Sequence, residues 1–195
     1  MSSGEIQRKE QKPNLALTDI ADIISSLYNF QYNSSIHKLK LLDSYDDQNV
    51  YINGIYDEKE IECCIKIHNG VESKAPEILD CQNQLLLHLY HHKFNVPLPL
   101  FNKKKERISY ICINNITHAI RLLTWVKGTK MSDIKPSLNL IYQCGIYLAK
   151  IRISLSTFQH TAAYRIHSWD LKQTNQLKEF LFAINDIQRK EYIQQ

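Results

Sequence analysis

The chain has 195 residues, of which 44% are hydrophobic and 23% are charged, and its formal net charge is +4 at pH 7. This composition excludes a disordered chain, and the length suffices for one well-buried domain or two small lobes. The mild positive charge suits an anionic ligand. Only one basic cluster, Lys103 to Arg107, is present, which is typical of a solvated hairpin turn. We therefore expect no nucleic-acid partner.

The cysteines and the apolar segments indicate where the protein resides. The five cysteines are odd in number and form no Cys-x-x-Cys pair, which favours reduced thiols over a disulfide framework or a zinc site. No run of 18 apolar residues is present, and the first ten residues lack the apolar core of a signal peptide. The sequence predicts a soluble, cytoplasmic protein with no membrane partner.

The chain begins with a polar stretch, residues 1–16, which we expect to be a flexible tail. Apolar residues at helical spacing predict a helix from Thr18 to Leu27. An apolar strand then leads from Leu39 into a polar turn, Ser44 to Asn49. Ser, Asp and Asn all favour turns, so this segment is read as a loop between two strands.

Two further strands follow the turn, Val50 to Tyr56 and Ile61 to Ile67. Gly54 marks either a bulge or a tighter turn, and the sequence leaves that choice open. Lys66 lies between two isoleucines, so in a strand it points to the opposite face. A lone lysine after a small polar turn favours a phosphate site, with the turn supplying N–H groups and hydroxyls. The alternatives are a lysine that extends to solvent and an ordinary polar turn.

The second half of the chain is predicted to be mostly helical. A helix is expected from Glu77 to about His92, and a strand from His118 to Val126. Pro136 to about Leu155 predicts a long amphipathic helix, in which Gly145 permits the close approach of a neighbour. Two shorter helices are expected after it, at 171–183 and 186–193.

Several segments in order resemble the aminoglycoside phosphotransferase (kinase-like) family. The specific part is Ser44-Tyr-Asp-Asp-Gln-Asn49 followed by Cys64-Ile-Lys-Ile67. Further matches follow at Asp80–Asn83, Ile120–Thr124 and Trp169–Lys172. The resemblance covers residue 18 to the end. It implies an α+β fold, in which a protein-kinase-like N-lobe has an antiparallel sheet of about five strands plus one helix, followed by the first helices of an incomplete helical C-lobe.

The resemblance also implies domain bounds and a nucleotide site. The N-lobe would span 17–126, and 127–195 would hold the hinge and the partial C-lobe. The family uses GTP or ATP with Mg²⁺, and the end of the last strand would offer backbone groups to the base. The implied nucleotide-binding residues are Ser44, Tyr45, Asp47, Gln48, Asn49, Lys66, Gln82, Leu123, Thr124, Trp125 and Val126. Two aspartates would repel a triphosphate, so Asp46 and Asp47 are expected to face away or to approach through metal or water.

In this family a helical glutamate orients the strand lysine, and the family spacing places Gln82 at that position. An amide can still hold Lys66 through its side-chain oxygen, although more weakly than a carboxylate. Asp80 lies about 200° around the helix from Gln82, so it would not share the face of Gln82. Glu77 is the other carboxylate within reach. The partner of Lys66 therefore stays open.

Phosphoryl transfer also needs an aspartate at the acceptor hydroxyl and a set of acids or amides that hold Mg²⁺. The family's His-Gly-Asp…Asn loop and its later Asp-x-Gly segment do not occur, so no catalytic residue and no metal ligand is assigned. Asp170 and Asn175 have the step of such a loop, but His167 lies one residue too far upstream, and a helix cap beside Trp169 is favoured. A weaker reading puts Trp169 near the acceptor site.

Three histidines at 88, 91 and 92 share one predicted helix at a spacing that metal sites use. No fourth ligand is apparent, so an exposed helical surface is the favoured interpretation and no metal is assigned.

The resemblance implies a GTP-dependent kinase of a small hydroxylated amine or amino acid, present as an incomplete copy that binds nucleotide and is inactive alone. The alternative is a non-catalytic, pseudokinase-like interaction module. A third hypothesis, an RNA-binding sheet, lacks the aromatic pair on adjacent strands that base stacking needs. The helix at 136–155 normally packs against further helices in the family, so its apolar stripe is expected to favour self-association.

Overall fold

The computed structural model of the chain describes residues 3–166 and 170–194. The chain divides into two compact units after His160. The expectations for His167 and Trp169 lie outside the described residues. The second unit contains short helical elements, η3 (Thr161–Tyr164), η4 (Leu171–Ala183) and α5 (Ile187–Gln194).

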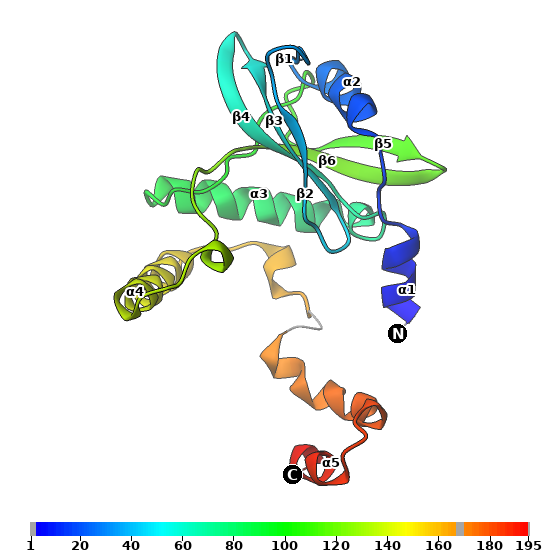
Figure 1. The fold of residues 1–195 in the computed structure, drawn as a ribbon, viewed down its shortest axis with the longest axis vertical. Coiled ribbons are helices and arrows are strands. Elements are labelled where there is room, and N and C mark those ends of the chain that lie inside the picture. The colour runs from blue at the N-terminus through cyan, green and yellow to red at the C-terminus, as the bar shows by residue number, and fades with distance from the viewer. Residues whose placement is uncertain (1–2, 167–169, 195) are drawn as a thin grey trace. The chain divides into compact units, whose positions relative to one another are not determined.

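The first unit is a mixed α+β structure (Figure 1). Its helices are α1 (Ser3–Glu10), α2 (Leu17–Leu27), η1 (Glu72–Lys74), α3 (Pro76–His91), η2 (Met131–Asp133) and α4 (Leu138–Leu155). Its strands are β1 (Phe30–Gln31), β2 (Leu39–Leu42), β3 (Gln48–Tyr56), β4 (Lys59–Ile67), β5 (Ser109–Ile113) and β6 (Ile116–Thr124). The expected fold class is confirmed. No helix among the described residues is long and apolar enough to cross a membrane.

The strands of the described chain form one six-stranded sheet in the order β1-β3-β4-β6-β5, with β2 also paired to β3. All of its pairs are antiparallel. Two hairpins have two-residue loops with positive φ at both residues, Asp57–Glu58 and Asn114–Asn115. Such turns match the right-handed twist of the flanking strands. The sheet agrees with the expected antiparallel sheet of about five strands, and its additional strand β1 is only two residues long.

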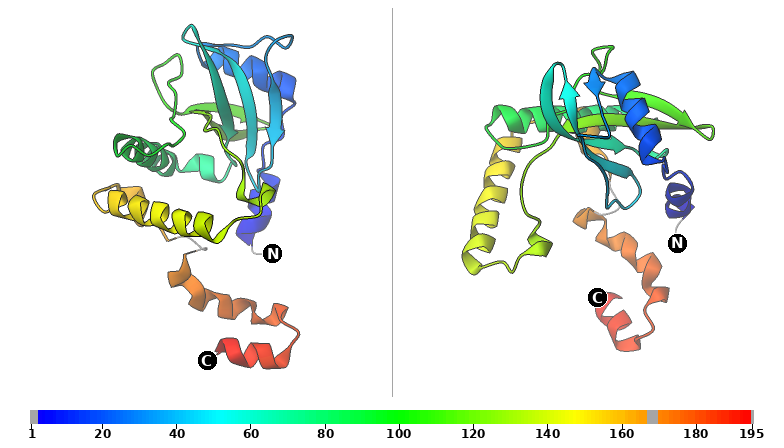
Figure 2. Two further views of the ribbon diagram at one scale, coloured as in Figure 1. Left: turned by 60° about the vertical axis from the view of Figure 1, so that its left-hand side comes forward. Right: turned by 45° about the horizontal axis from the view of Figure 1, so that its top comes forward.

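Helices cover both faces of the sheet, α2 on one and α3 on the other (Figure 2). The core between α2 and the sheet is aliphatic, and its fully buried members include Ile20, Ile24, Val50, Ile52, Ile65, Ile67, Ile120 and Leu122. Because side chains alternate along a strand, Lys66 lies on the opposite face from Ile65 and Ile67. Its cross-strand neighbours are Asn49 and Arg121. The sheet therefore presents Lys66 to the face that carries α3.

Residues 3–16, expected as a flexible tail, instead form α1 and an ordered connection to α2. The backbone N–H of Leu15 donates to Gln48 Oε1 at 2.9 Å, and Gln48 Nε2 donates to the Leu15 carbonyl at 2.8 Å. The N–H of Gly70 donates to the Gln11 carbonyl at 3.0 Å. These bonds use backbone groups of the segment, so its polar composition does not reveal them.

Gly54 sits in the regular β3–β4 ladder opposite Ile61, so it marks neither a bulge nor a turn. A Cβ at this position would lie 2.5 Å from both the Gln31 carbonyl oxygen and the Phe30 ring. We expect Gly54→Ala to lower the free energy of unfolding by about 2 kcal/mol, because the sheet must shift to admit a methyl group.

Urea denaturation measures this change, and Gly145→Ala in α4 is the matched control. Nothing among the described residues lies within 4 Å of a Cβ at Gly145, so the neighbour expected there is not found. Replacing a helical glycine by alanine in open space should raise stability by about 0.5–1 kcal/mol. Equal effects of the two substitutions would contradict the close contact at Gly54.

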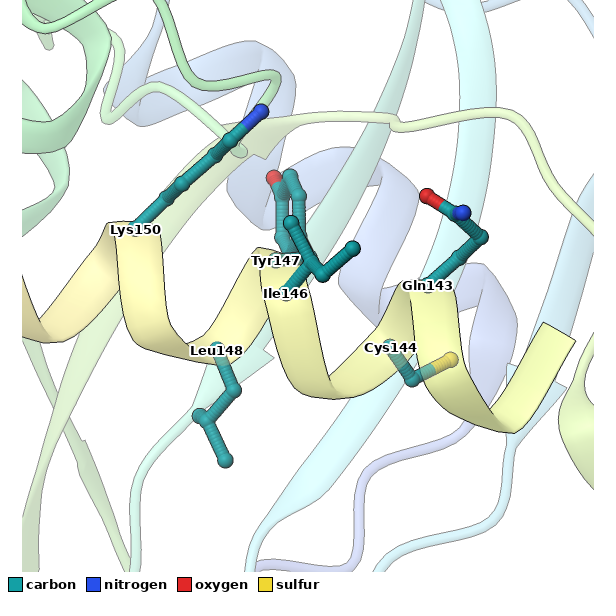
Figure 3. Close-up of a pocket in the computed structure, with 6 residues that line it drawn as sticks. All are labelled: Gln143, Cys144, Ile146, Tyr147, Leu148 and Lys150. Atoms are coloured by element: carbon teal, nitrogen blue, oxygen red, sulfur yellow. The ribbon is translucent and has the colours of Figure 1, made fainter. Parts of the chain in front are cut away.

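Helix α4 lies at the predicted place and packs against α3. His88 Nε2 lies 2.9 Å from the Ser154 carbonyl, and the rings of Phe94 and Tyr147 meet edge to face at 5.5 Å. Much of the rest of α4 is exposed; Leu148 has 67% of its surface accessible. Figure 3 shows Leu148 directed away from Tyr147 and Lys150 on the same helix. An open hollow of about 570 Å³ is lined by Gln143, Cys144, Ile146, Tyr147, Leu148 and Lys150.

Candidate functional site

The turn between β2 and β3 and the lysine of β4 meet in the structure. Lys66 Nζ forms an ion pair with Asp47 of the turn, and the two side chains are 26% and 9% exposed. Asp47 Oδ1 also accepts a hydrogen bond of 2.8 Å from the N–H of Asn69. The lysine therefore points at the turn and not into bulk solvent, and Asp47 is held from two sides.

The partner of Lys66 is thus Asp47, which differs from two expectations. Gln82 does not hold the lysine, because its Oε1 accepts a hydrogen bond from Arg121. Asp47 does not face away from the site, while the carboxylate of Asp46 is neutralised by Arg8. Of the other carboxylates considered, Asp80 lies 3.3 Å from His160 Nε2, and Glu77 is exposed. The amide of Gln82 instead faces β6, the strand next to that of Lys66. There the guanidinium of Arg121 offers five N–H donors, against three for the amine of a lysine.

Arg121 forms the centre of a buried polar network that sequence reasoning missed. It is 2% exposed, and burial lowers the pKa of its guanidinium to about 10. Its Nε donates to His68 Nε2 at 2.9 Å, and its two terminal nitrogens donate to Asn83 Oδ1 at 2.9 Å and to Gln82 Oε1. A lone arginine in an apolar strand was the available signal in the sequence. The network ties α3 to the sheet beside the lysine.

His68 links this network to Asp47. Burial, followed by the nearby charges of Arg121 and Lys66, lowers the pKa of His68 to about 2, so the ring is neutral. Because Nε2 accepts a hydrogen bond from Arg121, the proton of a neutral ring lies on Nδ1. Nδ1 is 3.8 Å from Asp47 Oδ2. At that distance the Nδ1–H group makes no hydrogen bond to the carboxylate that holds Lys66, and Nδ1 is buried without a hydrogen-bond partner among the described residues.

Three side chains of this cluster, Asp47, His68 and Glu72, are of types that bind metal ions. Ligand atoms of Asp47, His68 and Glu72 lie within 4.8 Å of one another. His68 cannot offer a lone pair there, since its Nδ1 carries the proton. The carboxylates already face cations, Lys66 at Asp47 and Arg8 at Glu72, the latter at 3.9 Å. These residues do not fit a divalent cation such as Mg²⁺.

The stability of the fold should depend on pH through His68. The pKa of His68 is about 2 in the folded state, against an ordinary value of 6.5. Below pH 6.5 the unfolded chain therefore binds a proton at His68, whereas the folded chain does not. The free energy of unfolding should therefore fall as the pH falls, by about 1.4 kcal/mol per pH unit from this group.

Urea unfolding of the wild type and of His68→Gln at about pH 7 and about pH 5 measures this effect. Gln accepts the Arg121 bond without titrating, so the variant should lose about 2 kcal/mol less between the two conditions. Parallel losses would assign the acid sensitivity to other groups.

The remaining residues of the turn are largely bonded within the fold. The carbonyl oxygens of Ser44 and Tyr45 accept hydrogen bonds from Lys12 Nζ. The amide of Gln48 is taken by the backbone of Leu15. Asn49 lies next to Lys66 across the ladder, and its Oδ1 is buried without a hydrogen-bond partner. The turn thus presents carbonyl groups at its tip. Gln48 and Asn49, expected in the turn, already belong to β3, and Asn49 has an unused polar atom beside the lysine.

The segment expected to be the hinge, 123–126, follows the end of β6. The N–H of Thr124 donates to the Leu98 carbonyl at 2.9 Å, and that of Trp125 to the Glu62 carbonyl at 2.8 Å. Those two donors are therefore used within the fold, while Leu123 pairs with Cys64 in the ladder. A hollow of about 390 Å³ lies beside the segment, and its lining includes Thr124, Trp125 and Val126.

No family model matches the chain. Among curated proteins, the hydroxylysine kinases of Bos taurus and Mus musculus are each 25% identical to it, over 209 and 210 residues. Both matches cover 100% of this chain and 54% of the relative; that of Xenopus laevis is 26% identical and covers 94% and 51%. The chain is similar to the hydroxylysine kinases. It spans about half the length of these curated relatives.

Solved structures of kinases share the fold. An amicoumacin kinase in complex with AMP-PNP and Ca²⁺ aligns with a TM-score of 0.64 at 13% identity, over 98% of this chain and 55% of that one. A microcompartment-associated aminopropanol kinase aligns with a TM-score of 0.58 at 15% identity, over 80% and 46%. At this identity the likeness concerns the fold alone. The kinase-like N-lobe with part of a helical lobe, inferred from the sequence, is confirmed.

Proposed function

We propose that the chain is a phosphotransferase of the hydroxylysine kinase type that binds the phosphates of a nucleotide between Lys66 and the 44–49 turn. The observation that carries this proposal is the convergence of the lysine and the turn on one face of the sheet. The 123–126 segment would lie against the base. The printed names of the relatives support the reaction class, and the bound AMP-PNP of the amicoumacin kinase supports a nucleotide ligand.

The finer parts of the proposal concern donor and acceptor. In the complete kinase, the donor is proposed to be GTP or ATP with Mg²⁺, and the acceptor the hydroxyl of 5-hydroxy-L-lysine. The positive charge of Lys66 would bind the phosphates, with Asp47 fixing its amine in place. The sequence contains no His-Gly-Asp string, so we propose that these 195 residues bind nucleotide without turning it over.

A titration of the chain with GTP and with ATP tests the proposal, together with a product assay on 5-hydroxylysine. We expect saturable binding of at least one nucleotide and no phosphorylated product. Formation of phosphorylated product would contradict the proposal that the 195 residues are inactive. The absence of any nucleotide binding would contradict the proposed nucleotide site at Lys66. In the second case the non-catalytic interaction module is favoured, because Asp47 already neutralises Lys66 and two donors of the hinge are engaged within the fold.

The exposed apolar residues of α4 lead us to propose that a second copy of the chain binds there. Leu148 is central to that surface, so Leu148→Glu should abolish a concentration-dependent dimer in sedimentation velocity. Asn139→Asp on the same helix adds the same charge at a residue that does not line this hollow, and it should leave the dimer intact. A monomeric wild type at all concentrations would contradict the proposal.

A further inference from the structure

The N-terminal segment is built into the turn that faces Lys66. Arg8 pairs with Asp46, and its carbonyl accepts a hydrogen bond of 2.6 Å from Asn69 Nδ2. The same Asn69 side chain donates to the Asp46 carbonyl at 3.1 Å, so one amide joins the segment and the turn. Together with the bonds made by Gln11 and Leu15, these contacts fix both sides of Lys12.

Lys12 differs from the other cations at the turn in the groups that it contacts. Asp47 faces Lys66, and both Asp46 and Glu72 face Arg8. These cations are therefore balanced by carboxylates. Lys12 Nζ instead contacts two backbone carbonyl oxygens, those of Ser44 at 3.1 Å and of Tyr45 at 2.9 Å. Within the part of the chain that the structure describes, it forms no ion pair with an acidic side chain.

The chemistry of an ammonium group decides what such a lysine offers. It has three N–H donors, of which the two carbonyls use two, so one donor and the whole charge remain. The carbonyls also hold the amine at the tip of the turn, which reduces the entropy lost when a ligand binds. Without Lys12 the tip would present only the negative ends of two carbonyl dipoles and would repel a phosphate. The positive charge of Lys12 offsets these dipoles and favours an anionic ligand at the tip.

We propose that Lys12 is a second phosphate-binding cation of this site, and that it binds the polyphosphate tail of a nucleotide. The inference rests on the proposed function and adds a binding residue from outside the expected lobe of residues 17–126. Because Asp47 offsets part of the charge of Lys66, the charge of Lys12 adds to the attraction that Lys66 has for an incoming polyanion. That attraction grows with each phosphate and is absent for a nucleoside.

The experiment compares wild type and Lys12→Gln in titrations with guanosine, GDP and GTP. Glutamine can still donate to the two carbonyls, so the variant removes the charge and keeps a contact to the turn. We expect GTP binding to weaken about fivefold and GDP binding about twofold, with guanosine unchanged. Lys12→Arg should retain most of the affinity, and the difference should shrink in high salt.

Lys104→Gln, an exposed lysine in the loop before β5, is the matched control and should leave all three affinities unchanged. Thermal melting of each variant reports whether the fold is kept. If wild type binds GTP and Lys12→Gln binds it equally well, the role of Lys12 is overturned and the proposed function stands. If wild type binds ATP but not GTP, the same comparison is made with adenosine, ADP and ATP. If wild type binds neither GTP nor ATP, the proposed function fails and this inference fails with it. An equal loss for guanosine and GTP would show a structural role for Lys12 and overturn the proposal.

Discussion

Lys66→Ala is expected to lower the free energy of unfolding by about 2–3 kcal/mol and to remove detectable nucleotide binding. The substitution leaves the Asp47 carboxylate, which is 9% exposed, with the Asn69 N–H as its main partner. Stranding a buried charge in this way costs about 3–5 kcal/mol, and the partial exposure of Lys66 reduces the effect. Urea denaturation and a GTP titration measure the two effects on the same sample.

A double-mutant cycle separates the ion pair from the packing of the lysine stem. Asp47→Ala together with Lys66→Ala should cost clearly less than the sum of the single variants, because the double variant strands no charge. Asp46→Ala is the control from the same turn, since its partner Arg8 is one-third exposed, and it should cost about 1 kcal/mol or less. Strict additivity of the two single effects would contradict the pair.

Arg121→Met is expected to cost about 3–4 kcal/mol, the largest effect of any substitution considered. Three acceptors lose their donor at once, namely His68 Nε2, Gln82 Oε1 and Asn83 Oδ1. A buried polar group left without a partner costs about 1–3 kcal/mol, and relaxation around the shorter side chain recovers part of the sum. Urea denaturation measures the change.

Arg107→Met provides the matched control for this substitution. Arg107 donates to one backbone acceptor, the Pro99 carbonyl, and lies over the Phe101 ring at 4.1 Å, but it is only half-buried. Its loss should cost about 1 kcal/mol. Similar losses of unfolding free energy for the two variants would show that burial of the Arg121 guanidinium contributes little to stability.

Local patterns in the sequence carry the parts of the fold that were predicted correctly. Alternation identifies β3 and β4 and sets Lys66 on the face opposite Ile65 and Ile67, since side-chain direction in a strand follows from position alone. The convergence of that lysine with the Ser44 turn came from a resemblance, not from periodicity. The structure adds the fact that Asp47 of the same turn is its partner.

The parts that the sequence did not predict depend on contacts between distant segments. Arg121 and Gln82 are 39 positions apart, and nothing local indicates that an amide in α3 faces β6 rather than Lys66. The N-terminal segment was misread for a related reason. Its composition is that of a tail, while the bonds that hold it run through the backbone of Gln11 and Leu15. Backbone N–H and carbonyl groups occur at almost every position of any sequence, so a residue pattern does not reveal which of them form such bonds.

The edge-to-face contact between Trp125 and Tyr51, with ring centroids 5.1 Å apart, gives the molecule an optical reporter of its own. Trp125 is 37% exposed and borders the hollow beside the 123–126 segment. Indole emission shifts when its surroundings change from water to a stacked aromatic ring. The sequence has a second tryptophan, Trp169, so we expect the emission of a Trp169→Phe variant to respond to a molecule that occupies that hollow, without any attached dye.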